Sequence, residues 1–277
     1  MAHKPAPGSP PAPTRGRLLN LPAEEVWAGI LMAVITVAIQ SGTFLAARYA
    51  SVPARAAVLA TLAAGTLWVA LVTGVFAAGA ATALRTVVRA GVVCDASAVT
   101  LLVLCLAARD PATGDRYVPL LAAAKIYCTY VALALAAAAA VCCARSPAGR
   151  TAVGVLVAVV LFASLATPFW MDGTLYRQAN DPEGVKTWGA AGAVFANPFY
   201  SVAAAVNERV RFVWHGAESL LYARKAVISE HFVPVPSVPW YAAPLVFAAL
   251  GTVLAAAAYL RHRLARKGES RPVDTET

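Results

Sequence analysis

Two charged side chains stand inside strongly apolar runs of this sequence, where they are candidates for intramembrane chemistry. Asp95 falls in the run 91–108, and Lys125 falls in the run 119–142. Ionisable groups inside a membrane are costly, so they pair with other groups or mark the path of an ion or substrate. A proton relay needs a chain of such groups, and the apolar runs contain no histidine. We therefore expect a local binding or structural role for each charge, and no proton relay.

Counted along the expected spans, these two charges lie at different depths. Asp95 is about four residues from the cytoplasmic end of its span, and Lys125 is about seven residues from the outer end of the next. This leaves roughly 15 Å between them at helical rise, so we do not expect a direct ion pair. Asp95 fits either a water-exposed helix start or a polar contact with a neighbouring helix. Lys125 fits either a side chain that snorkels to the outer interface or a functional site within the membrane.

Other residue types that build reactive sites occur without the spacing that such sites need. The five cysteines show no paired spacing and no interleaved histidines, which argues against a disulfide framework and a zinc site. The sequence also lacks the GxxxxGKS or GxxxxGKT loop of nucleotide-binding proteins and the HExxH and GxSxG patterns of hydrolases. We therefore expect no enzyme, no metal and no cofactor in this chain. The cysteines are Cys94, Cys105, Cys128, Cys142 and Cys143.

Composition indicates that membrane-spanning helices position these residues. Hydrophobic residues make up 60% of the 277 residues, charged residues make up 13%, and the mean hydropathy is +0.65. Soluble domains are about 45–50% apolar and about 25% charged. Six apolar runs are long enough to cross roughly 30 Å of hydrocarbon as helices, so we predict an all-α, polytopic membrane protein with six transmembrane helices. The spans are expected at 26–47, 57–80, 91–108, 119–142, 151–170 and 240–260.

The segments outside the spans divide the chain into a membrane domain and two tails. Residues 1–24 are too rich in proline to fold and too polar to insert, which predicts a disordered cytoplasmic tail. Residues 25–263 form the expected membrane domain, in which 171–239 is an extracytoplasmic helical subdomain between spans five and six. Residues 264–277 form a basic and polar cytoplasmic tail.

The distribution of basic residues predicts the orientation of this domain. With six spans both tails share one side, which holds twelve basic residues, against four in the short loops of the other side. Cytoplasmic loops carry an excess of Lys and Arg, so we place both termini in the cytoplasm and the protein in the plasma or inner membrane. The formal charge of +9 is scattered over loops and tails. It therefore predicts membrane topology and no nucleic-acid partner.

One apolar stretch, residues 191–214, is interrupted at its centre by Asn197 and Pro198. Each apolar arm is roughly eight residues, about 12 Å at helical rise, so neither arm spans the membrane alone. Asn197 can cap a new helix in which Pro198 is the first residue. From Phe199 onward, apolar residues recur at three- and four-residue spacing, which is typical of an amphipathic helix. We interpret the stretch as a re-entrant or interfacial helical segment; the alternative is a kinked transmembrane helix.

The order of these features resembles the permease subunits of the ABC type-2 exporter family. Members have a cytoplasmic lead, five spans, an outer segment with short helices, a sixth span and a basic tail. Many carry Asn-Pro before an apolar, aromatic-containing helix in the outer segment, which here reads ANPFYSVAAAVNERVR. The matching positions are Asn197, Pro198, Phe199 and Tyr200.

This resemblance implies a membrane-spanning permease subunit of an ATP-driven transporter. ATP would bind to a separate ATP-binding cassette subunit, and the permease would pair with a second copy or with a related chain among the membrane lipids. The basic loop LRTVVRAG, with Arg85 and Arg89, would contact the ATPase. Alternatively, these arginines serve only as topology signals. The competing functional hypothesis is a membrane scaffold or assembly protein whose outer amphipathic segment binds a partner.

Overall fold

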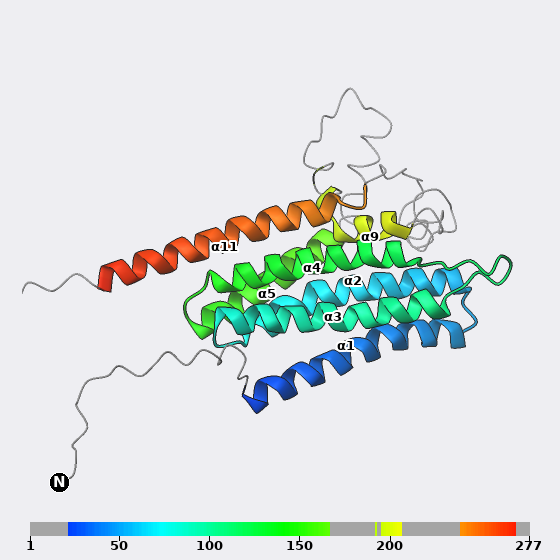
Figure 1. The fold of residues 1–277 in the computed structure, drawn as a ribbon, viewed down its shortest axis with the longest axis horizontal. Coiled ribbons are helices and arrows are strands. Elements are labelled where there is room, and N and C mark those ends of the chain that lie inside the picture. The colour runs from blue at the N-terminus through cyan, green and yellow to red at the C-terminus, as the bar shows by residue number, and fades with distance from the viewer. Residues whose placement is uncertain (1–21, 167–191, 193–194, 207–238, 270–277) are drawn as a thin grey trace, which may run out of the picture.

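The computed structural model describes residues 22–166, 192, 195–206 and 239–269 (Figure 1). These residues form seven helices and no strand. Six of the helices are long and apolar enough to cross a membrane, which confirms the all-α class and the six predicted spans. The helices are α1 (Ala23–Tyr49), α2 (Ala54–Ala78), α3 (Ala83–Ala107), α4 (Leu120–Cys142), α5 (Pro147–Leu165), α9 (Pro198–Val206) and α11 (Ala242–Glu269).

Local sequence signals account for where these helices begin. The hydroxyl of Thr82 accepts a hydrogen bond from the Arg85 backbone N–H at the start of α3. At the start of α5, Ser146 accepts a hydrogen bond from Gly149 and Pro147 occupies the first turn, where no helical N–H is lost. Prolines in extended conformation precede α1, α2 and α4 and cannot extend these helices backward.

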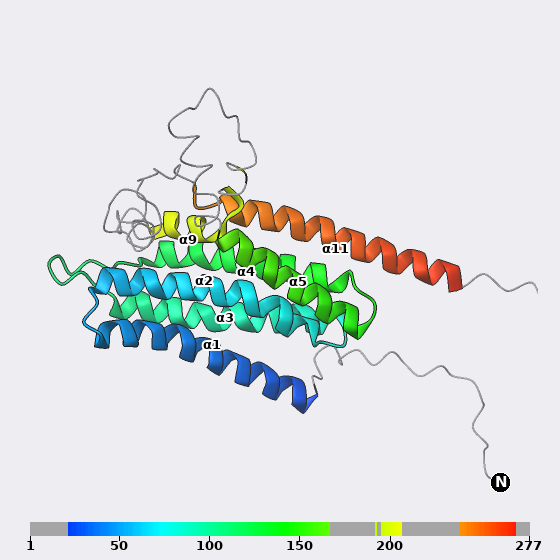
Figure 2. The same cartoon turned by 180° about the vertical axis from the view of Figure 1, so that it is seen from behind.

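The helices pack as a bundle with α2 and α4 at its centre. Helix α2 contacts α1, α3, α4 and α5, and helix α4 contacts α2, α3, α5 and α11. About half of the central residues of α2, α3 and α4 are buried, against fewer than a fifth in α1, α5 and α11. Figures 1 and 2 show α1 and α11 at opposite edges of the bundle. The three peripheral helices therefore present most of their apolar surface outward.

Small residues allow α2 and α5 to approach closely. A Cβ added at Gly154 of α5 would lie 2.6 Å from the backbone oxygen of Gly74 in α2. No side chain fits in that space, and backbone atoms cannot move aside as a flexible side chain can. The contact is thus a case of the small-residue packing that brings membrane helices together.

Polar side chains inside the bundle are satisfied largely by neighbouring helices or by their own backbone. Gln40 of α1 donates to the Ser97 hydroxyl of α3 at 2.8 Å, and Trp68 of α2 donates to the Thr36 hydroxyl of α1 at 3.0 Å. Thr66 donates to the carbonyl four residues earlier, a bond available to hydroxyls within helices. The bonds of Gln40 and Thr36 fix the rotational setting of α1, because these two are its buried residues.

Helix α3 begins earlier than the sequence predicted, and this changes the position of Asp95. The expected span was 91–108, but the helix begins at Ala83. Arg85 and Arg89, expected in a loop, lie instead in the first two turns of α3. Because both arginines have an acidic partner on α1, their charges do not require a loop. Asp95 is twelve residues from either end of α3, so its expected position about four residues from the end of a span is wrong.

Two helices extend past the boundaries expected for the membrane domain. Helix α1 starts at Ala23, inside the segment 1–24 expected to be a tail, and α11 continues to Glu269, beyond the expected limit at 263. The rest of the first tail, most of the subdomain 171–239 and the last eight residues lie outside the described residues. Figure 1 shows the start of α1 and the end of α11 at the same end of the bundle.

Candidate functional site

Helix α9 is capped by Asn197, as the sequence predicted. The side-chain oxygen of Asn197 accepts a hydrogen bond from the Phe199 backbone N–H at 2.9 Å, and α9 begins at Pro198. The side-chain amide of Asn197 donates to the backbone oxygen of Ser164, near the end of α5, at 2.7 Å. Asn197 is fully buried, so one side chain both starts α9 and ties it to the fifth span.

A second hydrogen bond ties α9 to the sixth span. The Ser201 hydroxyl accepts from the backbone N–H of Ala243, at the start of α11, at 3.0 Å. Helix α9 also contacts α4 and α2, and Figure 1 shows it beside α4 near the start of α11. Its nine residues extend only about 13 Å at helical rise, too short to cross a bilayer. The element is thus a short helix held against the bundle between spans five and six.

The side chains of α9 are buried on more than one side. Tyr200 and Val202 are 0% and 1% exposed, and Phe199 makes an edge-on contact with the Tyr200 ring. The first two turns of the predicted amphipathic helix carry no charged residue. The charged continuation from Asn207 onward lies outside the described residues. Within the Asn-Pro motif, Asn197 bonds α9 to the bundle, and Pro198 and Tyr200 are buried in it.

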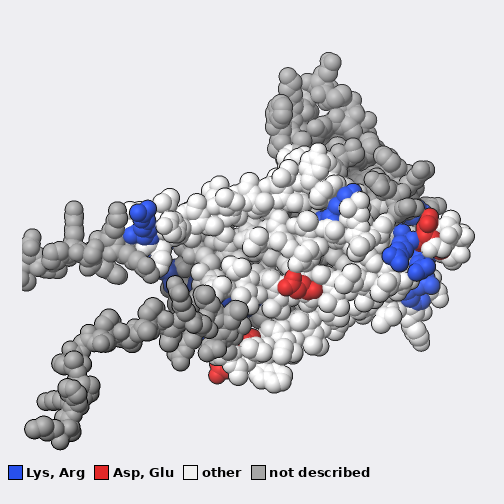
Figure 3. Space-filling model, in the orientation of Figure 1, with Lys and Arg blue, Asp and Glu red and all other residues white. Residues whose placement is uncertain are grey.

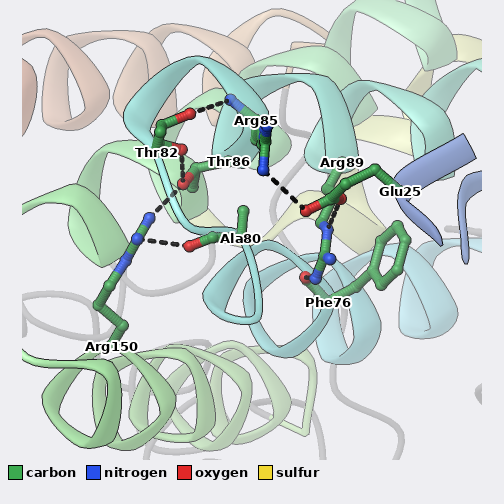
Figure 4. Close-up of polar contacts among 8 residues, drawn as sticks. All are labelled: Glu25, Phe76, Ala80, Thr82, Arg85, Thr86, Arg89 and Arg150. Atoms are coloured by element: carbon green, nitrogen blue, oxygen red, sulfur yellow. Dashed lines mark hydrogen bonds and ion pairs between the residues drawn. The ribbon is translucent and has the colours of Figure 1, made fainter. Parts of the chain in front are cut away.

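A cluster of arginines around Glu25 lies at the end of the bundle where α3 and α5 begin (Figure 4). The Glu25 carboxylate of α1 lies 2.8 Å from Arg89 and 3.9 Å from Arg85. Arg89 also donates to the Phe76 backbone oxygen at 3.3 Å, and its guanidinium lies 5.2 Å from the centre of the Phe76 ring. The Arg89 side chain is 17% exposed and that of Arg85 is 30% exposed. Of the two arginines, Arg85 is the more accessible to a partner.

Arg150, at the start of α5, bonds to the turn between α2 and α3 and to the first turn of α3, beside the arginines around Glu25. Its guanidinium donates to the backbone oxygen of Ala80 and to the hydroxyl of Thr86. Figure 4 shows the side chain reaching from α5 across to these two groups. Together, Arg150 and Arg89 link the ends of α1, α2, α3 and α5.

Sequence reasoning did not identify Glu25 or Arg150 as members of this cluster. Glu25 lies 64 residues from Arg89 along the chain. A usable signal was present, because an acidic residue and an arginine both stand near span ends on the same predicted side of the membrane. Which helices are neighbours, however, follows from packing and not from the sequence alone.

The two intramembrane charges have separate partners. The Tyr127 hydroxyl of α4 donates to the Asp95 carboxylate of α3 at 2.6 Å. The Lys125 ammonium lies 5.6 Å from the centre of the Trp240 ring, just before α11. In the described part of the chain, no ion pair joins Asp95 to Lys125. Asp95 thus makes a polar contact with a neighbouring helix, which is one of the two readings its sequence position allowed.

Comparison with protein-family models, curated proteins and solved structures found no match to this chain. Among the residues that the structure describes, no group of His, Cys, Asp and Glu is arranged to hold a metal ion.

Proposed function

We propose that this chain is the membrane-spanning permease subunit of an ATP-driven transporter of the ABC type, working with a separate ATP-binding subunit. The observation that carries the proposal is α9, a short helix capped by Asn197 between spans five and six and bonded to both. This order of elements is the one implied by the resemblance to type-2 exporter permeases. The cargo would pass between this membrane domain and its partner permease.

The bonding of α9 supports a role in transport, because it couples spans five and six at one end of the bundle. Asn197 holds α9 to Ser164 near the end of α5, and Ser201 holds it to Ala243 at the start of α11. A displacement of α5 relative to α11 must therefore move α9 or break one of these bonds. A re-entrant α9 at the outer end would convert helix movement into opening or closing of the outer side.

The arginine cluster supports an orientation with both termini in the cytoplasm. Arg85, Arg89 and Arg150 lie near helix starts at the end of the bundle that also holds the start of α1. Positive charge concentrates on the cytoplasmic side of membrane proteins. In this orientation the protein lies in the plasma or inner membrane, and α9 lies on the outer side.

The same cluster supports a division of roles between the two arginines expected to contact an ATPase. Arg89 is engaged by Glu25 and by the Phe76 backbone, so it holds the ends of α1, α2 and α3 together. Arg85 is more exposed and is the one available to an acidic surface of the ATP-binding subunit. ATP itself would bind to that subunit, so this chain needs no cofactor of its own.

The test is purification of the full chain from its native membranes in mild detergent, followed by identification of bound proteins and measurement of ATP hydrolysis. We expect a P-loop ATPase to co-purify and its turnover to change on binding this chain, whereas this chain alone hydrolyses no ATP. Arg85→Glu should weaken the association, because charge complementarity governs encounter and specificity at interfaces. The matched control is Arg145→Glu, a charge reversal at an exposed residue between α4 and α5. A stable assembly without any ATPase, and no change in turnover on mixing, would favour the membrane scaffold instead.

A further inference from the structure

Helix α4 presents an exposed stripe to the outside of the bundle. The stripe consists of Leu121, Ala124, Cys128 and Leu135, which recur at helical spacing and are all exposed. The opposite side of α4 is packed into the core against α2 and α5, with Tyr130 and Leu133 almost fully buried. Helices α3 and α11 also contact α4, and their contacts with Tyr127 and Lys125 place them on the two sides of the stripe.

Charges of opposite sign stand on the two sides of this stripe. At about 100° per residue, Tyr127 and Lys125 lie roughly 160° apart around α4, with Ala124 and Cys128 between them. Tyr127 reaches Asp95 of α3 on one side, and Lys125 reaches Trp240, just before α11, on the other. We call the stripe together with Asp95 and Lys125 the α4 face. Figure 3 shows an acidic patch in red and a basic patch in blue on the side in view, away from the charges at the two ends of the molecule.

The exposure of Asp95 indicates that lipid does not cover this face. Asp95 lies at the middle of a helix long enough to span, it is exposed, and within the described residues its bonded partner is a neutral tyrosine. Acidic residues within spans almost always face the bundle interior, a water-filled cavity or a polar partner, because ionised groups in hydrocarbon are costly. The surface around Asp95 is therefore suited to contact with protein that supplies positive charge.

We propose that the α4 face binds the α4 face of a second copy of this chain, with Asp95 of each copy opposite Lys125 of the other. A two-fold axis along the membrane normal near Cys128 exchanges the two sides of the face. It therefore places the acidic side of each copy against the basic side of the other, which gives two equivalent contacts. The interface is isologous, which is the commonest arrangement of homo-oligomers. This proposal does not depend on the transport function, since it rests on the exposed Asp95 carboxylate and on Lys125 at the other side of the stripe.

The depths of the two groups are compatible with this pairing. A two-fold axis along the membrane normal preserves depth, so each group must meet its partner at its own level. Tyr127, whose hydroxyl contacts Asp95, is two residues from Lys125, which is about 3 Å of helical rise. The flexible four-carbon stem of lysine covers a difference of this size. The small side chains at Ala124 and Cys128 let the two copies of α4 approach closely.

Cys128 provides a direct probe of this interface because it is exposed and lies near the proposed axis. We expect mild oxidation of membranes containing the full chain to produce a disulfide-linked dimer that disappears in Cys128→Ser. The matched control is Val160→Cys in the Cys128→Ser background, which places an exposed cysteine on α5, outside the α4 face. Dimer formation through position 160 and none through Cys128 would overturn the proposal. So would cross-linking of Cys128 to a different protein, which would assign the face to another partner.

Charge reversal tests the pairing itself. Asp95→Lys alone and Lys125→Asp alone each place like charges opposite one another in a homodimer, so the cross-linked fraction should fall about tenfold or more. Co-expression of one copy carrying Asp95→Lys with a differently tagged copy carrying Lys125→Asp restores opposite charges at both contacts. We expect mixed dimers to form near the unmodified level while homodimers stay rare. Equal amounts of mixed dimers and homodimers, with both variants present in the membrane, would exclude the intermolecular pair.

Discussion

Replacing Asn197 tests how α9 is attached to the rest of the bundle. Asn197→Ala removes two hydrogen bonds from a fully buried position: the cap to Phe199 and the contact with the backbone oxygen of Ser164. Loss of a helix cap costs about 1 kcal/mol. A polar contact between membrane helices is worth about 0.6 kcal/mol on average. We therefore expect the free energy of unfolding to fall by about 1.6 kcal/mol.

Asn197→Ser is the matched variant, because serine keeps a cap acceptor but cannot donate an amide N–H to Ser164. It should lose only the interhelical contact, about 0.6 kcal/mol. For a chain of this size 1 kcal/mol corresponds to roughly 2–4 °C in Tm. In detergent we thus expect Tm to fall by about 3–6 °C for Asn197→Ala and by about 1–2 °C for Asn197→Ser. Equal loss in both variants would show that the cap contributes nothing, and no loss in either would refute the attachment of α9 through Asn197.

Two further predictions concern contacts between helices. Glu25→Gln should lower the free energy of unfolding by about 1 kcal/mol, because it weakens a largely buried bond to the arginines of α3. In the same denaturation assay the control Glu24→Gln, at an exposed neighbour, should have no measurable effect. Gly154→Ala should lower the free energy of unfolding by about 1–3 kcal/mol, because it forces a methyl group against the Gly74 backbone. The control Gly91→Ala, with nothing within 4 Å of the added carbon, should leave the free energy of unfolding unchanged or raise it slightly.

The sequence predicted the number and type of the main elements because the information for them is local. Runs of about twenty apolar residues form helices in a membrane whatever their neighbours are, since every backbone polar group must then be satisfied within the segment. The start of α9 was predictable for the same reason, because Asn197 caps a residue only two positions away. The start of α3 was not, because Arg85 and Arg89 look like loop residues unless their partner on α1 is known.

The partners of the charged residues were decided by tertiary structure. Tyr127 lies 32 residues from Asp95 along the chain, and Glu25 lies 64 residues from Arg89. The hydrophobic pattern of an almost wholly apolar helix does not specify which side faces which neighbour, because lipid and protein interior are similarly apolar. The sequence by itself therefore determined six spanning helices, the capped short helix and two unusual intramembrane charges. Only the packing of α3, α4 and α11 determined that those charges stand on either side of one exposed stripe, because only packing sets the rotation of each helix about its axis.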